Sequence, residues 1–247
     1  MNHVVTLTGV TKKYGELTAL DDVSLGFPRG RFTAVMGPSG SGKSTLIQCA
    51  AALDTPTSGS VAIGGVDVGT LNETKRTELR RAHIGFVFQS YNLLPAITVE
   101  ENLTLTLRLA GRKPDLAWIR MLVERVGLHD RLRHRPGELS GGQQQRAAIV
   151  RALAGRPDVL FADEPTGALD LRSASQVLDL LRSMVDDLGQ TVVMVTHDPA
   201  AAARAHDALI MADGRLVDVL PAPSAEDLAA RLTRLAGRPV AAAGGAL

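Results

Sequence analysis

A run of nine residues has the composition and spacing of a phosphate-binding loop. The run consists of Gly37, Pro38, Ser39, Gly40, Ser41, Gly42, Lys43, Ser44 and Thr45. We expect a buried strand before it, over residues 32–36, and a helix after it, over residues 45–53. In that order the glycines let backbone N–H groups turn toward phosphate oxygens at a helix start, Lys43 reaches the β- and γ-phosphates, and the Ser44 hydroxyl binds Mg²⁺. A dinucleotide-binding fingerprint fits less well, because it needs a glycine where Thr45 stands.

Polar side chains follow three apolar runs that read as strands. Gln89 follows residues 84–88, Asp163 and Glu164 follow residues 159–162, and His197 follows residues 191–196. Each side chain alone could be surface or structural, but the carboxyl ends of parallel strands meet at one edge of a sheet. At that edge the Asp163 carboxylate is suited to bind Mg²⁺, and we expect Ser44 and Gln89 to be further metal ligands. Glu164 could orient or deprotonate water, and Gln89 could sense the γ-phosphate or position that water.

A second helix start could bind an anion. Ser140 and Gln143 have the spacing of a capping box, and Gly141 and Gly142 leave the backbone N–H groups uncovered. Taken alone, the same residues also describe a well-capped helix. Tyr14 precedes the second expected strand on a predicted loop, where it could stack on adenine or cap the sheet.

The remaining sequence gives an α/β fold. Apolar strands alternate with helical stretches, but between about residues 90 and 155 the signals are helical, which indicates a helical subdomain inserted between two core strands. We therefore expect one phosphate-loop domain over residues 1–220 that also holds an antiparallel β part. Residues 221–247 form an extension, with a short helix and then a disordered Ala/Gly-rich tail.

Composition limits the possible environments and partners. The chain of 247 residues has a formal net charge of +1, so it lacks the basic field expected of a nucleic-acid-binding protein. The single cysteine, Cys49, cannot form an internal disulfide and is expected to be a packing residue. We see no signal peptide and no apolar run of the ~18 residues that a membrane span requires. The expectation is a soluble, cytoplasmic chain.

Together these motifs resemble the ATP-binding cassette (ABC) ATPases over about residues 4–220. The octet from Leu139 to Arg146 decides this, because it matches the ABC signature motif between a phosphate loop and a strand ending in two acids. A phosphate-loop kinase would not explain the octet. The resemblance implies ATP and Mg²⁺ as ligands, and it implies roles for six residues: adenine stacking by Tyr14, the Q-loop glutamine Gln89, the magnesium ligand Asp163, the catalytic Glu164, the D-loop Asp170 and the switch histidine His197.

The resemblance also implies partners. Family members form a head-to-tail homodimer in which the phosphate loop of one subunit and the residues equivalent to Ser140, Gly141 and Gly142 of the other enclose each ATP. Residues 90–95, 141–146 and 163–170 are similar to the ATPases of macrolide exporters, lipoprotein-releasing complexes and the cell-division pair that controls wall hydrolysis. That similarity implies a four-span permease with a large external domain, a location on the inner face of the membrane, and either transport or mechanotransmission. The soluble ABC ATPases of DNA repair and translation fit less well, because here there is one cassette and one compact insert.

Overall fold

The computed structural model describes residues 2–236, in which strands and helices alternate along most of the chain. The strands are β1 (His3–Tyr14), β2 (Leu17–Pro28), β3 (Phe32–Met36), β4 (Ser58–Ile63), β5 (Val66–Asp67), β6 (Ile84–Phe88), β7 (Val159–Asp163), β8 (Thr191–Val195), β9 (Asp207–Ala212) and β10 (Arg215–Pro221). The α-helices are α1 (Lys43–Ala50), α2 (Glu73–His83), α3 (Val99–Leu109), α4 (Leu116–Arg125), α5 (Gly141–Leu153), α6 (Leu171–Leu188), α7 (Pro199–Ala202) and α8 (Ala225–Ala236). The α/β class expected from the sequence is confirmed.

A six-stranded sheet forms the centre of the molecule. Its strand order is β10-β9-β3-β8-β7-β6, and every neighbouring pair is parallel except β9 and β10. All five residues of β3 and of β8 are buried, which explains why these strands read as continuous apolar runs. Because side chains alternate across a strand, Phe32, Ala34 and Met36 pack in the core that contains α5 and α6, while Val35 packs in the core that contains α1.

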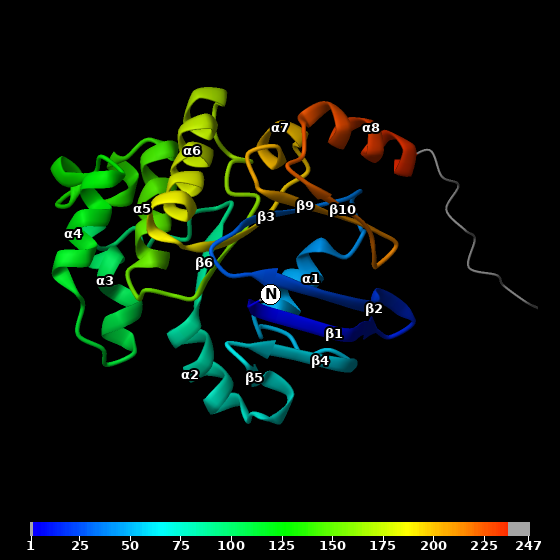
Figure 1. The fold of residues 1–247 in the computed structure, drawn as a ribbon. Coiled ribbons are helices and arrows are strands. Elements are labelled where there is room, and N and C mark those ends of the chain that lie inside the picture. The colour runs from blue at the N-terminus through cyan, green and yellow to red at the C-terminus, as the bar shows by residue number, and fades with distance from the viewer. Residues whose placement is uncertain (1, 237–247) are drawn as a thin grey trace, which may run out of the picture.

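A second, antiparallel sheet covers the α1 side of the molecule. Its order is β2-β1-β4-β5, and Figure 1 shows it below the central sheet with α1 between them. The chain turns from β4 into β5 at Gly64 and Gly65, which both adopt the positive φ that a two-residue hairpin turn requires. Cys49 of α1 is fully buried in the core that this sheet shares, as expected of a packing residue.

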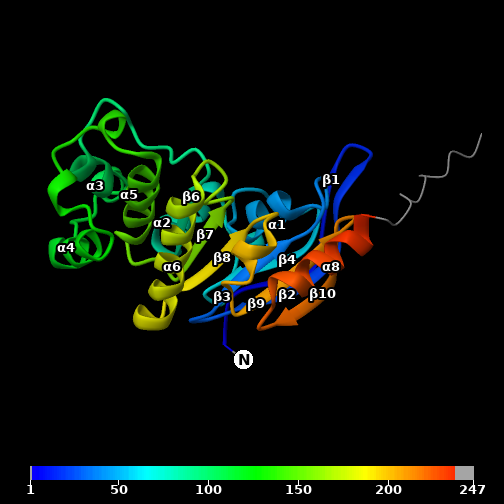
Figure 2. The same ribbon diagram turned by 90° about the horizontal axis from the view of Figure 1, so that it is seen from above.

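Helices α3, α4 and α5 lie between β6 and β7 in the sequence and to one side of both sheets in space (Figures 1 and 2). The predicted capping box forms at Ser140–Gln143 and starts α5, and a second capping box at Thr98–Glu101 starts α3. Helix α5 is the link to the sheet, because it packs against β6 as well as against α3 and α6. The helical insertion thus attaches to the strand that Gln89 follows.

Helix α8 covers the central sheet beside α7 (Figure 1). Leu228 is fully buried, and Leu232 and Leu235 pack against the same core, because their spacing places them on one face of the helix. Arg231 forms an ion pair with Asp218 of β10. The predicted disordered tail lies outside the described residues. Within residues 2–236, no helix combines the length and the apolar character that crossing a lipid bilayer would need.

Candidate functional site

The phosphate loop joins the end of β3 to the start of α1, and two of its glycines are required by sterics. A Cβ atom on Gly37 would lie 2.2 Å from the backbone oxygen of Met211 at the end of β9. Gly42 has φ of 94°, and a Cβ there would lie 2.4 Å from the backbone oxygen of Ala19. The neighbouring strands therefore force a close backbone course that only glycine allows.

The start of α1 has backbone donors available for an anion. Gly42 is the N-cap and supplies no side-chain hydrogen bond, so the first N–H groups of the helix have no capping partner from that residue. Ser39, Gly40 and Ser44 are exposed at this surface, Pro38 and Thr45 are half-buried, and Ser41 is buried beneath it. The arrangement suits phosphate oxygens.

The Lys43 ammonium folds back over the loop. Its Nζ donates to the backbone oxygens of Gly37 at 2.8 Å and Pro38 at 2.7 Å. Burial lowers the pKa of Lys43, while Glu164 and Asp163 act in the opposite direction. A half-buried ammonium held by backbone carbonyls beside two acids is suited to bind an incoming phosphate.

The strand ends bring the polar side chains together, as their positions in the sequence suggested. Ser44, Gln89, Asp163 and Glu164 line one cavity of about 340 Å³, which opens between α1 and the ends of β6 and β7. His197 joins this group, because its Nδ1 lies 2.8 Å from Oε1 of Glu164. Glu164 has φ of 47°, a left-handed conformation that is strained for a non-glycine residue.

The surroundings of Asp163 disfavour its ionised form. Burial raises the pKa of Asp163, repulsion from Glu164 adds to that effect, and Lys43 opposes it. A bound cation stabilises a carboxylate whose ionised form is disfavoured. Ser44, Gln89 and Asp163 all line this cavity, and their side-chain oxygens form a ligand set that fits Mg²⁺. Bound Mg²⁺ would neutralise phosphate charge at this position.

The second predicted anion site lies apart from that cavity. Ser140 accepts a hydrogen bond from the backbone N–H of Gln143 at 3.3 Å and caps α5, but neither residue lines the cavity. A Cβ on Gly141 would lie 2.8 Å from the Tyr91 hydroxyl, and one on Gly142 would lie 3.0 Å from the Ser173 side chain. The glycines thus let α5 pack against the Q-loop and the start of α6.

Asp170 caps α6 by accepting from the Ser173 N–H at 2.9 Å. Hydrogen bonding to the Ser173 side chain, followed by this bond from the Ser173 backbone, lowers the pKa of Asp170. Asp170 therefore lies next to Gly142 through Ser173, and it does not line the cavity that contains Asp163 and Glu164.

Tyr14 differs from its expected setting. It is the last residue of β1 and pairs with Leu17 across a tight hairpin, so it lies in a strand and not on a loop. Its side chain is 46% exposed, and its hydroxyl donates to Asp54 at 2.6 Å. That bond raises the pKa of Tyr14. The Lys12 Nζ lies 4.8 Å from the centroid of the Tyr14 ring, so the ring already has a cationic neighbour.

Two functional candidates on α5 were missed from the sequence. Gln145 is fully buried and Arg151 donates to the backbone oxygen of Tyr91 at 2.9 Å, on the loop after Gln89. The available signal was helical spacing, because Gln145 shares the buried face of α5 with Ile149 and Leu153. A polar residue on an apolar face calls for a buried hydrogen-bond partner.

Comparisons with known proteins agree with this geometry. Residues 20–167 match the family model described as ABC transporter. The chain is 44% identical over 217 residues to the lipoprotein-releasing system ATP-binding protein LolD 1 of Rhodospirillum rubrum, covering 85% of this chain and 96% of that protein. It is 48% identical over 220 residues to the macrolide export ATP-binding/permease protein MacB 1/2 of Paracoccus denitrificans, covering 87% of this chain. The chain spans only 33% of the length of that second relative.

A solved structure gives the same fold. A dimeric ATP-binding cassette in a post-hydrolysis state, with ADP and Pi bound, superposes with a TM-score of 0.78 at 38% identity, over 89% of this chain and 99% of the other. The family match spans the phosphate loop, the signature octet and the strand that ends in Asp163 and Glu164. The chain belongs to the ABC transporter family and is an ATPase of that family.

Proposed function

We propose that this chain is the ATP-hydrolysing subunit of a membrane ABC complex and drives a partner permease through ATP-dependent dimerisation. The observation that carries the proposal is the single cavity shared by Ser44, Gln89, Asp163 and Glu164 beside the Lys43 ammonium. Lys43 binds the β- and γ-phosphates, Asp163 holds Mg²⁺ with Ser44 and Gln89, and Glu164 orients or deprotonates the attacking water. His197 holds Glu164 and contacts the γ-phosphate.

The proposal of a dimer rests on the nucleotide site, which one subunit alone leaves incomplete. Ser140, Gly141, Gly142 and Gln143 do not line the cavity that Ser44 and Glu164 line, although they form a helix start suited to an anion. A second copy in head-to-tail orientation supplies that helix start to the ATP held by the phosphate loop, and Tyr14 stacks on its adenine. Closure depends on the γ-phosphate, so hydrolysis reopens the dimer.

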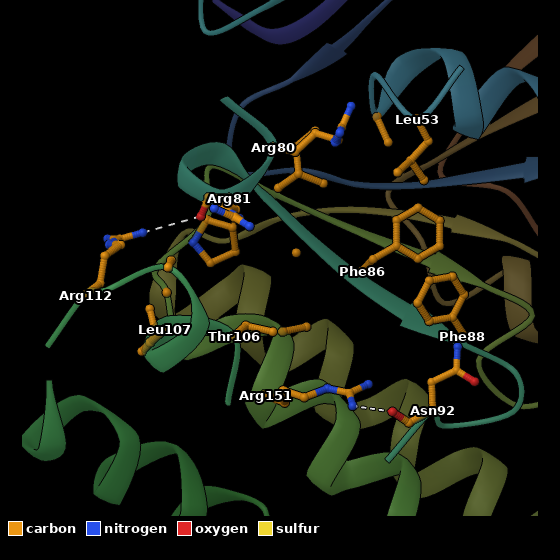
Figure 3. Close-up of a pocket in the computed structure, with 17 residues that line it drawn as sticks. Leu53, Arg80, Arg81, Phe86, Phe88, Asn92, Thr106, Leu107, Arg112 and Arg151 are labelled. Carbon is orange, nitrogen blue, oxygen red and sulfur yellow. Dashed lines mark hydrogen bonds between the residues drawn. The ribbon is translucent and has the colours of Figure 1, made fainter. Parts of the chain in front are cut away.

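A groove on the other side of β6 suits the permease. This groove of about 450 Å³ lies between α2, α3, α5 and β6, and Figure 3 shows its labelled residues. Phe86 and Phe88 stack with ring centroids 4.4 Å apart on its floor, while Arg80, Arg81 and Arg112 border it, and no acidic residue lines it. An apolar cytoplasmic segment of the permease with an acidic residue complements this surface. The groove also reaches Asn92 on the loop after Gln89, where Leu93 packs against the core and Leu94 is 47% exposed.

The proposal is tested with Glu164→Gln, purified with ATP from its native membranes and analysed by mass spectrometry. We expect this variant to bind ATP, to form a stable dimer and to bring down a four-span permease with a large external domain. Its matched control is Lys43→Ala, which should lose about 10-fold or more in ATP affinity, because a charge-assisted hydrogen bond to phosphate is removed.

Two results contradict the proposal in different ways. Recovery of only ribosomal or DNA-associated proteins by Glu164→Gln would overturn the membrane role and leave the ATPase assignment intact. Unchanged ATP affinity in Lys43→Ala would overturn the role given to the phosphate loop itself.

A further inference from the structure

A buried amide on α5 joins two strand ends of the proposed catalytic site. Gln145 is fully buried, and its Nε2 donates to the backbone oxygen of Pro165 at 2.7 Å and to that of Phe88 at 3.4 Å. Phe88 immediately precedes Gln89, and Pro165 immediately follows Glu164. One side chain therefore holds the backbone on both sides of the cavity.

The amide can make this link in only one orientation. Both neighbours of Nε2 are carbonyl oxygens, so the side chain must donate to them, and a flipped amide would place oxygen against oxygen. The Oε1 atom of Gln145 is buried with no hydrogen-bond partner among the described residues. An unmade bond in a buried group costs free energy, so the position of Gln145 is not explained by the stability of α5 alone.

The turn after Glu164 also contacts Gln89 directly. A Cβ on Gly167 would lie 2.9 Å from Nε2 of Gln89, and the Gly167 N–H donates to the Glu164 oxygen at 3.1 Å. The turn that carries Glu164 thus packs on Gln89 while Gln145 binds it from behind. A shift of this turn would therefore displace both Glu164 and Gln89.

Helix α5 holds the loop beyond Gln89 as well. Arg151 donates to the backbone oxygens of Tyr91 and Asn92, and Figure 3 shows the second of these contacts. Tyr91 and Asn92 have φ of 58° and 51°, left-handed conformations that the Arg151 contacts help to hold. Because Ser140 caps the start of α5, the helix that presents the signature residues is fixed to the backbone next to Gln89 and Glu164.

We propose that Gln145 is a positioning residue for ATP hydrolysis, which aligns Gln89 and Glu164 with each other and with the signature helix by donating to Phe88 and Pro165. The inference rests on the proposed roles of Gln89 and Glu164. Gln145 itself touches neither the cavity nor the phosphate loop. Its loss should therefore reduce kcat and leave the KM for ATP within about twofold, since the residues that bind phosphate stay in place.

The test is the pH profile of Gln145→Glu. In this variant an ionised carboxylate would lie against the carbonyl oxygens of Phe88 and Pro165 and would displace the turn after Glu164. The protonated acid has the same shape and can donate a hydrogen bond to one of these oxygens. Burial and these carbonyls raise the pKa of the introduced acid, so protonation occurs near neutral pH. We expect kcat, corrected for the folded fraction at each pH, to be about 10-fold below wild type at pH 8 and within about threefold of it at pH 6.

Two controls separate alignment from general damage. Gln145→Met has a similar volume and no donor, so its kcat should be about 10-fold low at both pH values. Gln190 makes the same kind of bond at the opposite end of β7, where its Nε2 donates to the Pro157 oxygen at 3.1 Å. Gln190→Glu should therefore keep the wild-type kcat and pH profile.

The inference would be overturned if Gln145→Met had the kcat of the wild type. It would also be overturned if the kcat of Gln145→Glu, divided by that of the wild type, did not change with pH. Glu164→Gln is assayed in parallel to separate the two proposals. If Glu164→Gln is inactive and the Gln145 variants behave as wild type, only the positioning role fails. If Glu164→Gln hydrolyses ATP normally, the proposed catalytic site itself fails.

Discussion

The two ends of the central sheet carry similar polar side chains, but these side chains differ in how they are partnered. At the carboxyl end of β7, Asp163 lies beside Glu164, and its pKa is raised by burial and by that neighbour. His197 contacts Glu164 but has a side chain that is 76% exposed. This edge holds acids close together, with Lys43 as the nearby cation.

At the opposite end of β7 the acid is fully partnered. Asp158 binds Arg29 at 2.9 Å and His83 at 2.5 Å, which ties the starts of β6 and β7 to the end of β2. Burial alone would raise the pKa of Asp158, but the bonds from His83 and Arg29 lower it on balance. Arg31 and Asp207 pair in a similar way at the start of β9.

The difference separates function from stability within one sheet. Carboxylates with cationic partners stabilise the folded state, whereas buried carboxylates next to one another reduce its stability and are retained where a ligand needs them. Variants at the carboxyl edge should therefore change turnover, and variants at the opposite edge should change stability.

The largest effect is expected for Glu164→Gln. The substitution keeps the shape of the side chain and removes the carboxylate proposed to deprotonate or orient water, so kcat should fall by about 10²–10⁴-fold. Steady-state turnover, with ATP affinity measured separately, checks this. Asp158→Asn is the control from the opposite edge, and its kcat per folded molecule should match the wild type. A large loss of turnover in both variants would contradict the contrast between the two edges.

A smaller effect, on stability, is expected for Asp158→Asn. The change weakens the bonds to Arg29 and His83 and should lower the free energy of unfolding by about 1–2 kcal/mol. Urea denaturation measures this through the midpoint at constant slope. An unchanged midpoint would mean that the partnered edge does not stabilise the sheet.

The smallest effect is the response of stability to acid through His206. Its Nδ1 accepts from the Phe32 N–H at 3.0 Å, and burial, followed by Arg182 and Arg31, lowers its pKa against the opposing effect of Asp186 and Asp207. The unfolded chain therefore takes up the proton first, so this contribution is intact above about pH 6.5 and decreases as the pH falls below it.

His206→Asn keeps an acceptor for the Phe32 N–H and does not titrate. The difference in unfolding free energy between pH 7.5 and pH 5.5 should therefore be smaller in this variant than in the wild type. Equal pH dependence in both proteins would assign the acid sensitivity to other groups.

Much of the fold could be predicted because its signals are local. The run before Gly37, the capping box at Ser140 and the acids after residues 159–162 each lie within a few residues of the element they define. Tyr14 was placed wrongly, because β1 continues past Val10 through register shifts that interrupt the simple alternation. Helix α1 likewise ends at Ala50, three residues before the predicted end.

Contacts between distant residues were not predictable in this way. Asp158 is 129 positions from Arg29 and 75 from His83, and Gln145 is 57 from Phe88. These pairs depend on the order of strands in the sheet, which periodicity does not specify. The same limit explains why the buried amide of α5 was overlooked although the signature octet was recognised.

The most direct test of the contrast between the two edges is a pair of measurements on Asp163→Asn. The free energy of unfolding is measured without nucleotide or Mg²⁺, and ATP turnover is measured with both. Because the folded state disfavours the ionised Asp163, removing its charge should raise the free energy of unfolding at pH 7.5, by about 1 kcal/mol. ATP turnover should fall sharply in the same variant. A loss of stability, or turnover equal to the wild type, would contradict the assignment of this edge to nucleotide chemistry.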